Sequence, residues 1–413
     1  MRILHTSDWH LGQTLHGQDR DFEHACFLDW LLEQLKTRQP DALLIAGDVF
    51  DTINPPVKAQ ERLYNFIVQA HLALPKLTVV MIAGNHDSGA RIELPAPLMR
   101  SLRTHALGRV LWLDDGSLDA KRLLVPLTDA EGETKAWCLA LPFLRPAEVT
   151  GGSDGTYMDG IARVHAELIA HAETRRTQGQ ALIAMSHAHL AGGQVSEDSE
   201  RNIIVGNAEA QPASLFPPEI AYVALGHLHK PQKVVKQDRI RYSGSPLPLS
   251  FAEVDYQHQI LDVRLEGEAL KTIESVRIPR AVEMMRLGPA PLQDIIEHLH
   301  SLPDLDLFNT PDSQLAPWLE VRVTLDAPQP DLRQRLESAL EGKSLRLVRI
   351  GVHYAGATNS TPDEPSALVA LEQLTPQDLF SRAWQDTYGQ APESAVLDDF
   401  AQLLEDVTLG EQA

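Results

Sequence analysis

Short apolar runs alternate with amphipathic stretches over residues 1 to about 255. Five of these runs have the length and content of buried β-strands, and they lie at residues 3–6, 41–46, 77–82, 182–185 and 221–225. Between the first three runs, apolar residues recur at helical spacing, as Phe27, Trp30, Leu31 and Leu35 and then as Leu63, Phe66, Ile67 and Ala70. This alternation predicts an α/β fold.

A different pattern covers residues 281 to about 354. We expect three strands and two helices here, in the order 282–285, helix 292–299, 318–325, helix 331–340 and 345–354. The strand at 318–325 has the clearest pattern, because its apolar residues recur at every second position, as Leu319, Val321, Val323 and Leu325. The segment therefore predicts a small βαβαβ module in a domain of its own.

Composition divides the chain into four parts: a first domain at 1–275, a second at 276–355, a linker at 356–366 and a helical tail at 367–413. The linker lies in the run AGATNSTPDEPS, which is rich in turn-forming residues. In the tail, Thr375 and Pro376 favour a helix start, and Gly389 favours its end. A second amphipathic helix follows from about Glu393. We expect these helices to bind a partner; the alternative is that they pack on their own domain.

Composition bounds the class of protein. A chain of 413 residues is long enough for two or three domains. The two cysteines, Cys26 and Cys138, are far apart and match no disulfide framework or thiolate metal site. No apolar stretch reaches the length of a membrane span, and the start of the chain does not resemble a signal peptide. We expect a cytoplasmic protein that does not enter a membrane.

The formal net charge of −21 is unusual for a protein that binds DNA by itself. The charge is uneven, with −14 from residue 281 onward and −7 before it. The acidity therefore argues only weakly against a nucleic-acid substrate. The negative charge favours a basic partner that would supply part of the binding to DNA.

Polar residues follow each apolar run of the first domain directly. The carboxyl ends of strands in α/β sheets are where sites form, because a rigid scaffold holds the side chains there. The residues concerned are Asp8 and His10, Asp48 and Asp51, Asn85 and His86, His187, and His227 and His229. The glycines before Asp48, Asn85 and His227 are expected to let the backbone turn sharply into the site. Five such signals together are much stronger than a single histidine pair.

Hydrolysis of a phosphoester needs an activated water and neutralised phosphoryl oxygens, and two metal ions about 3.5–4 Å apart supply both. Asp48 is the natural bridging carboxylate. We expect Asp8, His10 and His229 to complete the shell of one ion. Asn85, His187 and His227 are then expected to complete the shell of the other. Mixed oxygen and nitrogen ligands suit Mn²⁺, Fe or Zn²⁺ better than Ca²⁺.

His86 is not needed as a ligand and is well placed to donate a proton to the leaving oxygen. Either Asp51 or Asp87 could fix its tautomer, and we favour Asp51. His189 is expected by default to be structural or on the surface, although it could compete with His187 for the same ligand position. Structural or surface roles are expected for three other histidines, His5, His16 and His24, and surface positions for four basic residues near the motifs, Arg20, Lys58, Arg91 and Arg145.

The five signals resemble the signature of the calcineurin-like metallophosphoesterase superfamily. Within it, the chain closely resembles the SbcD family, the nuclease subunits of bacterial SbcCD complexes. The blocks that carry this resemblance are MRILHTSDWHLGQ, AGDVFD, AGNHDS, PFLRP at 142–146, ALGHLHKPQ and GSPLPLSFAE at 244–253. One departure is Ser186-His187-Ala188-His189, where the family usually shows Gly-His before a small polar run.

The resemblance implies a two-sheet αββα sandwich, a small α+β capping domain and C-terminal helices. It implies two Mn²⁺ ions, held by the ligands named above, with His86 as the catalytic histidine. The implied activity is 3′-to-5′ exonuclease action on duplex DNA and endonuclease action on single strands and hairpins, in DNA replication, recombination and repair. The implied partner is an SbcC-type ABC ATPase with a coiled coil, which itself uses the ATP, and two copies of each chain assemble.

Two other functions compete with a DNA nuclease. A phosphoesterase on small or protein substrates is one, but Thr52 and Ile53 follow Asp51 where protein phosphatases of the superfamily place an arginine. A scaffold without catalysis is the other, and the complete ligand set argues against it.

Overall fold

The computed structural model describes residues 1–150, 155–195, 210–303 and 315–354, together with residues 380, 381, 384, 392, 396, 397 and 400. The chain forms two compact units, Met1–His353 and Tyr354–Ala413. The division falls next to the linker expected from composition, and the two domains expected before that linker both lie in the first unit.

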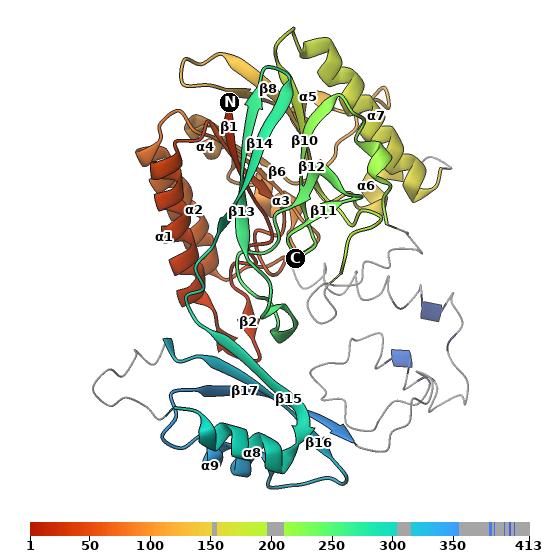
Figure 1. The fold of residues 1–413 in the computed structure, drawn as a ribbon. Helices are drawn as coiled ribbons and strands as arrows, with labels where there is room; N and C mark the ends of the chain where they lie inside the picture. Colours follow the sequence, from red (N-terminus) through yellow and green to blue (C-terminus); the bar gives the residue numbers. More distant parts are fainter. Residues whose placement is uncertain are drawn as a thin grey trace. The chain divides into compact units, whose positions relative to one another are not determined.

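Two six-stranded sheets make up the first domain (Figure 1). The first has the order β14 (Ala269–Arg277), β13 (Gln259–Glu266), β1 (Arg2–Thr6), β4 (Ala42–Ala46), β5 (Thr78–Ile82) and β6 (Thr104–Leu107). The second has the order β11 (Gln232–Val234), β12 (Gln237–Tyr242), β10 (Ile220–Gly226), β9 (Ala181–His187), β8 (Thr134–Leu141) and β7 (Leu124–Thr128). Strands β1, β4, β5 and β6 run parallel, as do β8, β9, β10 and β12.

Strand β4 shows why the layers stack as they do. All five of its residues are buried, because alternate side chains enter two different cores. Leu43 and Ile45 join the core under α1 (Asp21–Arg38) and α2 (Val57–Ala73). Leu44 instead joins the core between the two sheets. Helix α7 (Tyr157–Arg175) covers the second sheet in the same way. The predicted αββα sandwich is confirmed (Figure 1).

The hairpin of β13 and β14 was not predicted. Strand β13 pairs antiparallel with β1 and extends the first sheet beyond its parallel part. Most residues of β14 are exposed or half-buried, so it has no continuous apolar run that would reveal it.

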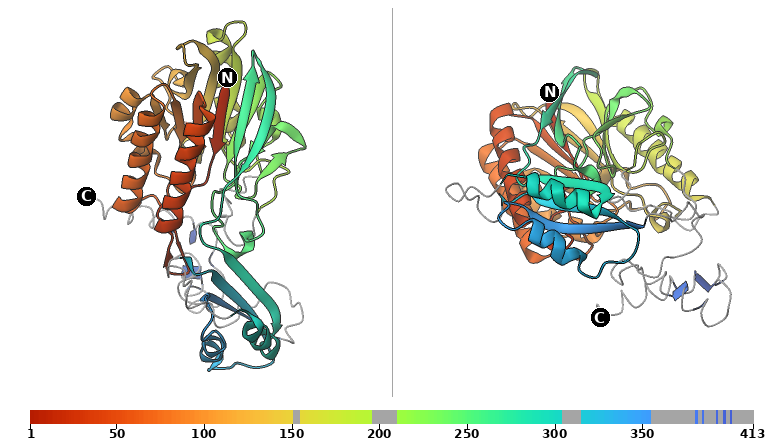
Figure 2. Two further views of the ribbon diagram at one scale, coloured as in Figure 1. Left: turned by 60° about the vertical axis from the view of Figure 1, so that its left-hand side comes forward. Right: turned by 60° about the horizontal axis from the view of Figure 1, so that its bottom comes forward.

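The second domain is a three-stranded sheet of order β15 (Met284–Pro291), β16 (Trp318–Leu325) and β17 (Arg346–Tyr354). Helices α8 (Leu292–Ser301) and α9 (Leu332–Ala339) lie on one face of it (Figure 2). The βαβαβ prediction is confirmed, although β15 begins later and extends further than expected. Its later half contains Gly288-Pro289-Ala290-Pro291 and an irregular register, which hides the strand pattern.

Shorter elements connect these layers: β2 (Thr14–Leu15), β3 (Gln18–Asp19), α3 (Gly89–Glu93), α4 (Ala96–Met99), α5 (Ala120–Leu123), α6 (Pro146–Thr150), and the 3₁₀ turns η1 (Arg100–Leu102), η2 (Ala213–Leu215) and η3 (Phe251–Glu253). No helix among the described residues is long and apolar enough to cross a membrane.

The predicted tail helices lie almost entirely outside the described residues. Two described positions bear on them. The rings of Phe380 and Phe400 stack with their centroids 4.0 Å apart. Phe380 falls in the first expected tail helix and Phe400 in the second, and these two side chains contact each other.

Candidate metal centre

Both sheets contribute to one cluster of polar side chains. Asp8 and His10 follow β1, Asp48 follows β4, and Asn85 and His86 follow β5, all in the first sheet. From the second sheet come His187 at the end of β9, and His227 and His229 just after β10. The structure therefore brings together the residues predicted from the strand ends.

The backbone at this cluster is unusual. Asp8, His10, Asp48 and His227 have φ values of 55°, 46°, 46° and 106°, in the region that residues other than glycine rarely adopt. Such conformations cost free energy and gather where the surrounding structure fixes a functional side chain. The positive φ values turn the chain abruptly at the strand ends.

The glycines before the ligands act in two ways. Gly47 has a φ of 89°, as expected for a sharp turn. Gly84 and Gly226 do not have positive φ, so the expectation of a turn is wrong there. A Cβ on Gly84 would lie 2.1 Å from Asp48 Oδ1, and a Cβ on Gly226 would lie 1.9 Å from the carbonyl oxygen of Ala46. These two glycines permit close approach rather than a turn.

Donor atoms of Asp8, His10 and His229 lie within 4.8 Å of one another. Nε2 of His10 is buried and has no hydrogen-bond partner among the described residues. It lies 3.6 Å from Oδ2 of Asp48. A buried nitrogen without a partner is costly unless a ligand occupies its lone pair, and a metal ion at this place would do so.

A second group of donors also meets beside Asp48. Oδ1 of Asn85 lies 2.9 Å from Nε2 of His187 and 3.1 Å from Nδ1 of His227. The same His187 nitrogen is 3.3 Å from Oδ2 of Asp48. Donor atoms of Asp48 thus lie beside both groups, as a bridging carboxylate requires. This set of oxygens and imidazole nitrogens fits two divalent cations.

Electrostatics favour positive charge at the centre. Burial raises the pKa of Asp8. Burial also acts to raise the pKa of Asp48, but the neighbouring His187, His10 and His86 together outweigh it and hold that pKa well below its usual range. Conversely, burial lowers the pKa of His187, and the Asp48 carboxylate more than offsets this, so the pKa rises to about 9. A divalent cation would satisfy the same carboxylates.

Asp51 contacts His86, although not as expected. Its backbone carbonyl accepts a hydrogen bond from Nδ1 of His86 at 2.8 Å, whereas its carboxylate lies 3.1 Å from Nδ1 of His10. The backbone N–H of His86 donates to Oδ1 of Asp48 at 2.8 Å. Because a carbonyl only accepts, Nδ1 of His86 carries the proton in this contact and Nε2 is the nitrogen left for chemistry.

Asp87, the other candidate to orient His86, has a different role. Its carboxylate accepts the backbone N–H groups of Val49, Phe50 and Gly84 at 3.1, 2.9 and 2.8 Å. Burial raises the pKa of Asp87 to about 6. The side chain ties the loop that carries Asp48 to the loop that carries Asn85.

His187 and His189 occupy different places. His187 is buried within reach of Asp8, Asp48 and Asn85. His189 is half-buried, and its ring centroid lies 6.2 Å from that of His227. The described metal-binding groups include His187 and not His189. The geometry favours His187 as the ligand.

Other residues near the motifs divide between the surface and the interior. Lys58 and Arg91 are exposed, as expected. Arg145 is half-buried and donates to the carbonyl oxygen of Asp87 at 2.8 Å. Arg20 is fully buried, so its predicted surface position is wrong. His5 and His24 are buried in hydrogen bonds outside the metal groups, which agrees with structural roles.

One partner of the cluster was missed. Nδ1 of His229 lies 2.9 Å from Oε1 of Glu253, which is fully buried. Glu253 ends the block GSPLPLSFAE, so the resemblance marked the segment but not the role of its carboxylate. A metal-binding histidine commonly donates its second nitrogen to such a carboxylate.

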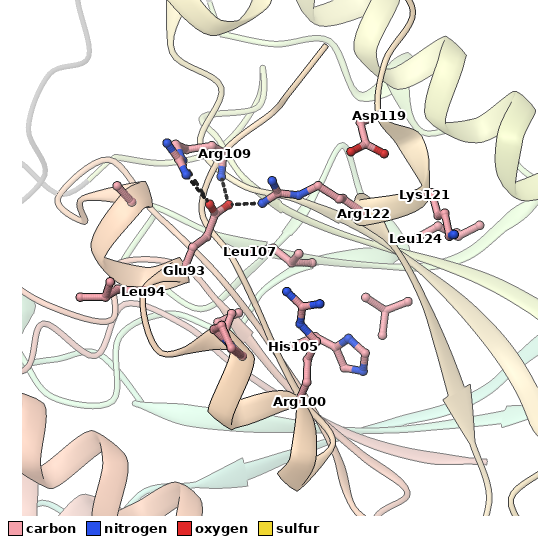
Figure 3. Close-up of a pocket in the computed structure, with 15 residues that line it drawn as sticks. Glu93, Leu94, Arg100, His105, Leu107, Arg109, Asp119, Lys121, Arg122 and Leu124 are labelled. Carbon is pink, nitrogen blue, oxygen red and sulfur yellow. Dashed lines mark hydrogen bonds and ion pairs between the residues drawn. The ribbon is translucent and has the colours of Figure 1, made fainter. Parts of the chain in front are cut away.

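A cavity of about 880 Å³ lies elsewhere, between the edge strands β6 and β7 (Figure 3). None of the predicted metal or catalytic residues lines it. Within it, Glu93 forms ion pairs with Arg109 and Arg122 at 2.8 and 2.7 Å. The metal-binding groups therefore lie outside this cavity.

Comparison with known proteins adds an independent observation. The family model of calcineurin-like phosphoesterases matches residues 1–231, and that of the type 5 capsule protein repressor C-terminal domain matches 280–388. The chain is 40% identical over 400 residues to the SbcD component of the SbcCD nuclease from Rhodobacter capsulatus, covering 93% of this chain and 94% of that protein. It is 33% identical over 362 residues to the Escherichia coli K12 protein of the same name, covering 85% and 84%. The Bacillus subtilis counterpart is 38% identical over 266 residues, covering 63% and 65%.

Proposed function

The chain belongs to the SbcD family of calcineurin-like phosphoesterases, and on this premise we propose that it is the DNA nuclease subunit of an SbcCD-type complex. The observation that carries the proposal is the convergence of donor groups from two sheets around Asp48. The names of the relatives identify them as nuclease subunits. The reaction is hydrolysis of phosphodiester bonds with two divalent metal ions.

The ligand roles follow from the two groups. Asp8, His10 and His229 hold one ion, Asn85, His187 and His227 hold the other, and Asp48 bridges them. When bound, the ions supply an activated water and neutralise the phosphoryl oxygens. Oxygens and imidazole nitrogens without a thiolate suit Mn²⁺, Fe or Zn²⁺, and among these we propose Mn²⁺ because the family resemblance implies it.

His86 acts on the leaving oxygen. Its Nδ1 is held by the carbonyl oxygen of Asp51, which fixes the ring and leaves Nε2 to carry the transferred proton. Donor atoms of His10, Asp48 and His86 lie within 4.8 Å of one another, so the imidazole is beside the metal groups. Asp51 contributes through its carbonyl oxygen to His86 and through its carboxylate to the orientation of His10.

We also propose a specific DNA substrate and a specific assembly for this nuclease. We propose 3′-to-5′ degradation of duplex DNA and endonucleolytic cutting of single strands and hairpins, together with an SbcC-type ATPase in a two-plus-two complex. The acidic charge of this chain supports a basic partner on the DNA. The tail 367–413 is the segment proposed to bind the ATPase.

A nuclease assay tests the proposal directly. The protein is incubated with linear duplex, hairpin and single-stranded DNA, with Mn²⁺ or Mg²⁺, and with or without the ATPase. Release of nucleotides from 3′ ends in Mn²⁺ is the expected result. Hydrolysis of p-nitrophenyl phosphate esters without cleavage of any DNA would instead favour a small-molecule phosphoesterase. Removing residues 367–413 is expected to prevent co-purification with the ATPase, whereas a retained complex would refute that role of the tail.

A further inference from the structure

Glu253 lies between a predicted metal ligand and the second domain. Its Oε1 is 2.9 Å from Nδ1 of His229, and its Oε2 accepts the backbone N–H of Leu249 at 2.7 Å. The side chain is fully buried. A buried carboxylate is costly unless its charge is used, and here it fixes both an imidazole and the loop before it.

The loop 245–253 is held from its other side by Arg20. This buried arginine donates to the backbone carbonyl of Pro248 and to Oε1 of Gln13, and Gln13 in turn donates to the carbonyl of Leu249 at 3.2 Å. Two hydrogen bonds of 2.6 and 2.7 Å to Glu23 fix the guanidinium itself. The planar group therefore has little freedom to move without the loop.

The second domain contacts the same structure. The Arg20 guanidinium lies over the ring of Trp318, 5.4 Å from its centroid, and Trp318 begins strand β16 of the second domain. A separate apolar cluster joins the domains, and Phe251 in it is only two residues before Glu253. The members of that cluster are Leu15, Phe251, Val282, Met284, Trp318 and Val348.

We propose that Glu253 is a positioning residue that orients His229 toward the metal pair, and that packing of Trp318 on Arg20 and Phe251 makes the second domain part of this support. The hydrogen bond from Nδ1 leaves Nε2 of His229 for the metal, and a donor nitrogen of this histidine lies within 4.8 Å of donor atoms of Asp8 and His10. Any displacement of Trp318 is transmitted through Phe251 and Pro248 to Glu253. The inference rests on the proposed metal centre but not on DNA as the substrate.

Calorimetric titration of the full-length protein with MnCl₂, in the absence of DNA, tests this support. The variants are Glu253→Ala and Glu253→Gln. Loss of a second partner of a metal-binding histidine weakens metal affinity about 10–100-fold. We expect Glu253→Ala to lower the affinity for one of the two Mn²⁺ ions by this factor and to leave the affinity for the other unchanged. Glu253→Gln should recover part of the affinity, because its amide oxygen still accepts from Nδ1.

Trp318→Ala and the milder Trp318→Phe test the part played by the second domain. We expect Trp318→Ala to lower the affinity for the same ion about tenfold, at the lower end of that range. Trp318→Phe should lower this affinity by less. Leu336→Ala is the matched control, since Leu336 is fully buried in the second domain but belongs to a different cluster from Trp318. It should lower the melting temperature without changing Mn²⁺ affinity.

Wild-type affinity for both ions in Glu253→Ala would overturn the positioning role. Wild-type affinity in both Trp318 variants, or equal weakening in Leu336→Ala, would overturn the contribution of the second domain. Failure of the DNA proposal gives a different result, because wild-type protein would then bind two Mn²⁺ ions without cutting DNA.

Discussion

The two sheets supply different chemistry to the same centre. The first sheet supplies Asp8, His10, Asp48 and Asn85, and thus all the oxygen donors, from three neighbouring strands. The second supplies three imidazoles. Since the buried carboxylates all come from one side, the negative charge of the centre belongs to the first sheet. Cations at this place would tie the two layers together.

Support for the ligands is also unequal. In the first sheet, the Asp87 carboxylate joins the loops after β4 and β5. The histidines of the second sheet depend on the first: Nδ1 of His187 lies 2.9 Å from the carbonyl oxygen of Ala46, and the backbone N–H of His227 donates to Oδ1 of Asp8 at 2.9 Å. The first sheet therefore holds two of the proposed second-sheet ligands, His187 and His227, in place.

The largest expected effect comes from the shared carboxylate. Asp48→Asn should remove detectable nuclease activity and lower the content of both metal ions, because one side chain serves both groups. Bound metal is measured by plasma mass spectrometry after gel filtration. Asp41→Asn is the control at the opposite end of β4, where the carboxylate accepts only the backbone N–H of Arg2 among its described hydrogen bonds. Loss of a single ion in Asp48→Asn would contradict the bridging role.

His86→Ala tests whether every polar side chain of the first sheet at the centre is a ligand. Turnover should fall about 10²–10⁴-fold, the usual contribution of a general acid, while the metal content stays at two ions. His105→Ala on β6 is a matched histidine control that lines the separate cavity. If His86→Ala also loses metal, the residue is a ligand and the proposed acid must be another group.

The sequence predicted that these side chains lie together because each proposed ligand follows an apolar run closely. The strand ends alone place Asp8, Asp48 and Asn85 at one edge of a parallel sheet. Burial of Arg20 and the contact of Glu253 could not be predicted, since both depend on a loop that packs between domains. The roles of Gly84 and Gly226 were also misjudged, because close approach leaves no local pattern, whether it lies within the first sheet at Gly84 or between the sheets at Gly226.

The paired histidines of the second sheet allow a sharper test. His187→Ala should raise the Mn²⁺ concentration for half-maximal activity by more than about 100-fold, beyond the range for an outer partner of a ligand. His189→Ala should change it little, because His189 is half-buried and outside the described metal groups. The measurement is activity against free Mn²⁺, with direct titration of the ion as a check. Equal effects of the two variants would reopen the assignment.

The smallest expected effect comes from two glycine substitutions. They distinguish a close approach within the first sheet from a close approach between the two sheets. In Gly226→Ala the new Cβ would meet the carbonyl oxygen of Ala46 at 1.9 Å, across the interface between the sheets. Overpacking of this kind costs about 1–3 kcal/mol, and the second-sheet ligands should shift with it. In Gly84→Ala the new Cβ would instead meet Oδ1 of Asp48 at 2.1 Å, so metal affinity should suffer first. Gly351→Ala in β17 is the control, because its nearest neighbour would be Cγ of Arg322 at an ordinary 3.6 Å.

Thermal melts without Mn²⁺ measure the loss of stability, and melts with Mn²⁺ measure the loss of metal affinity. If Gly226→Ala melts like Gly351→Ala, the two sheets can separate without cost, and the first sheet alone does not fix the place of the histidines.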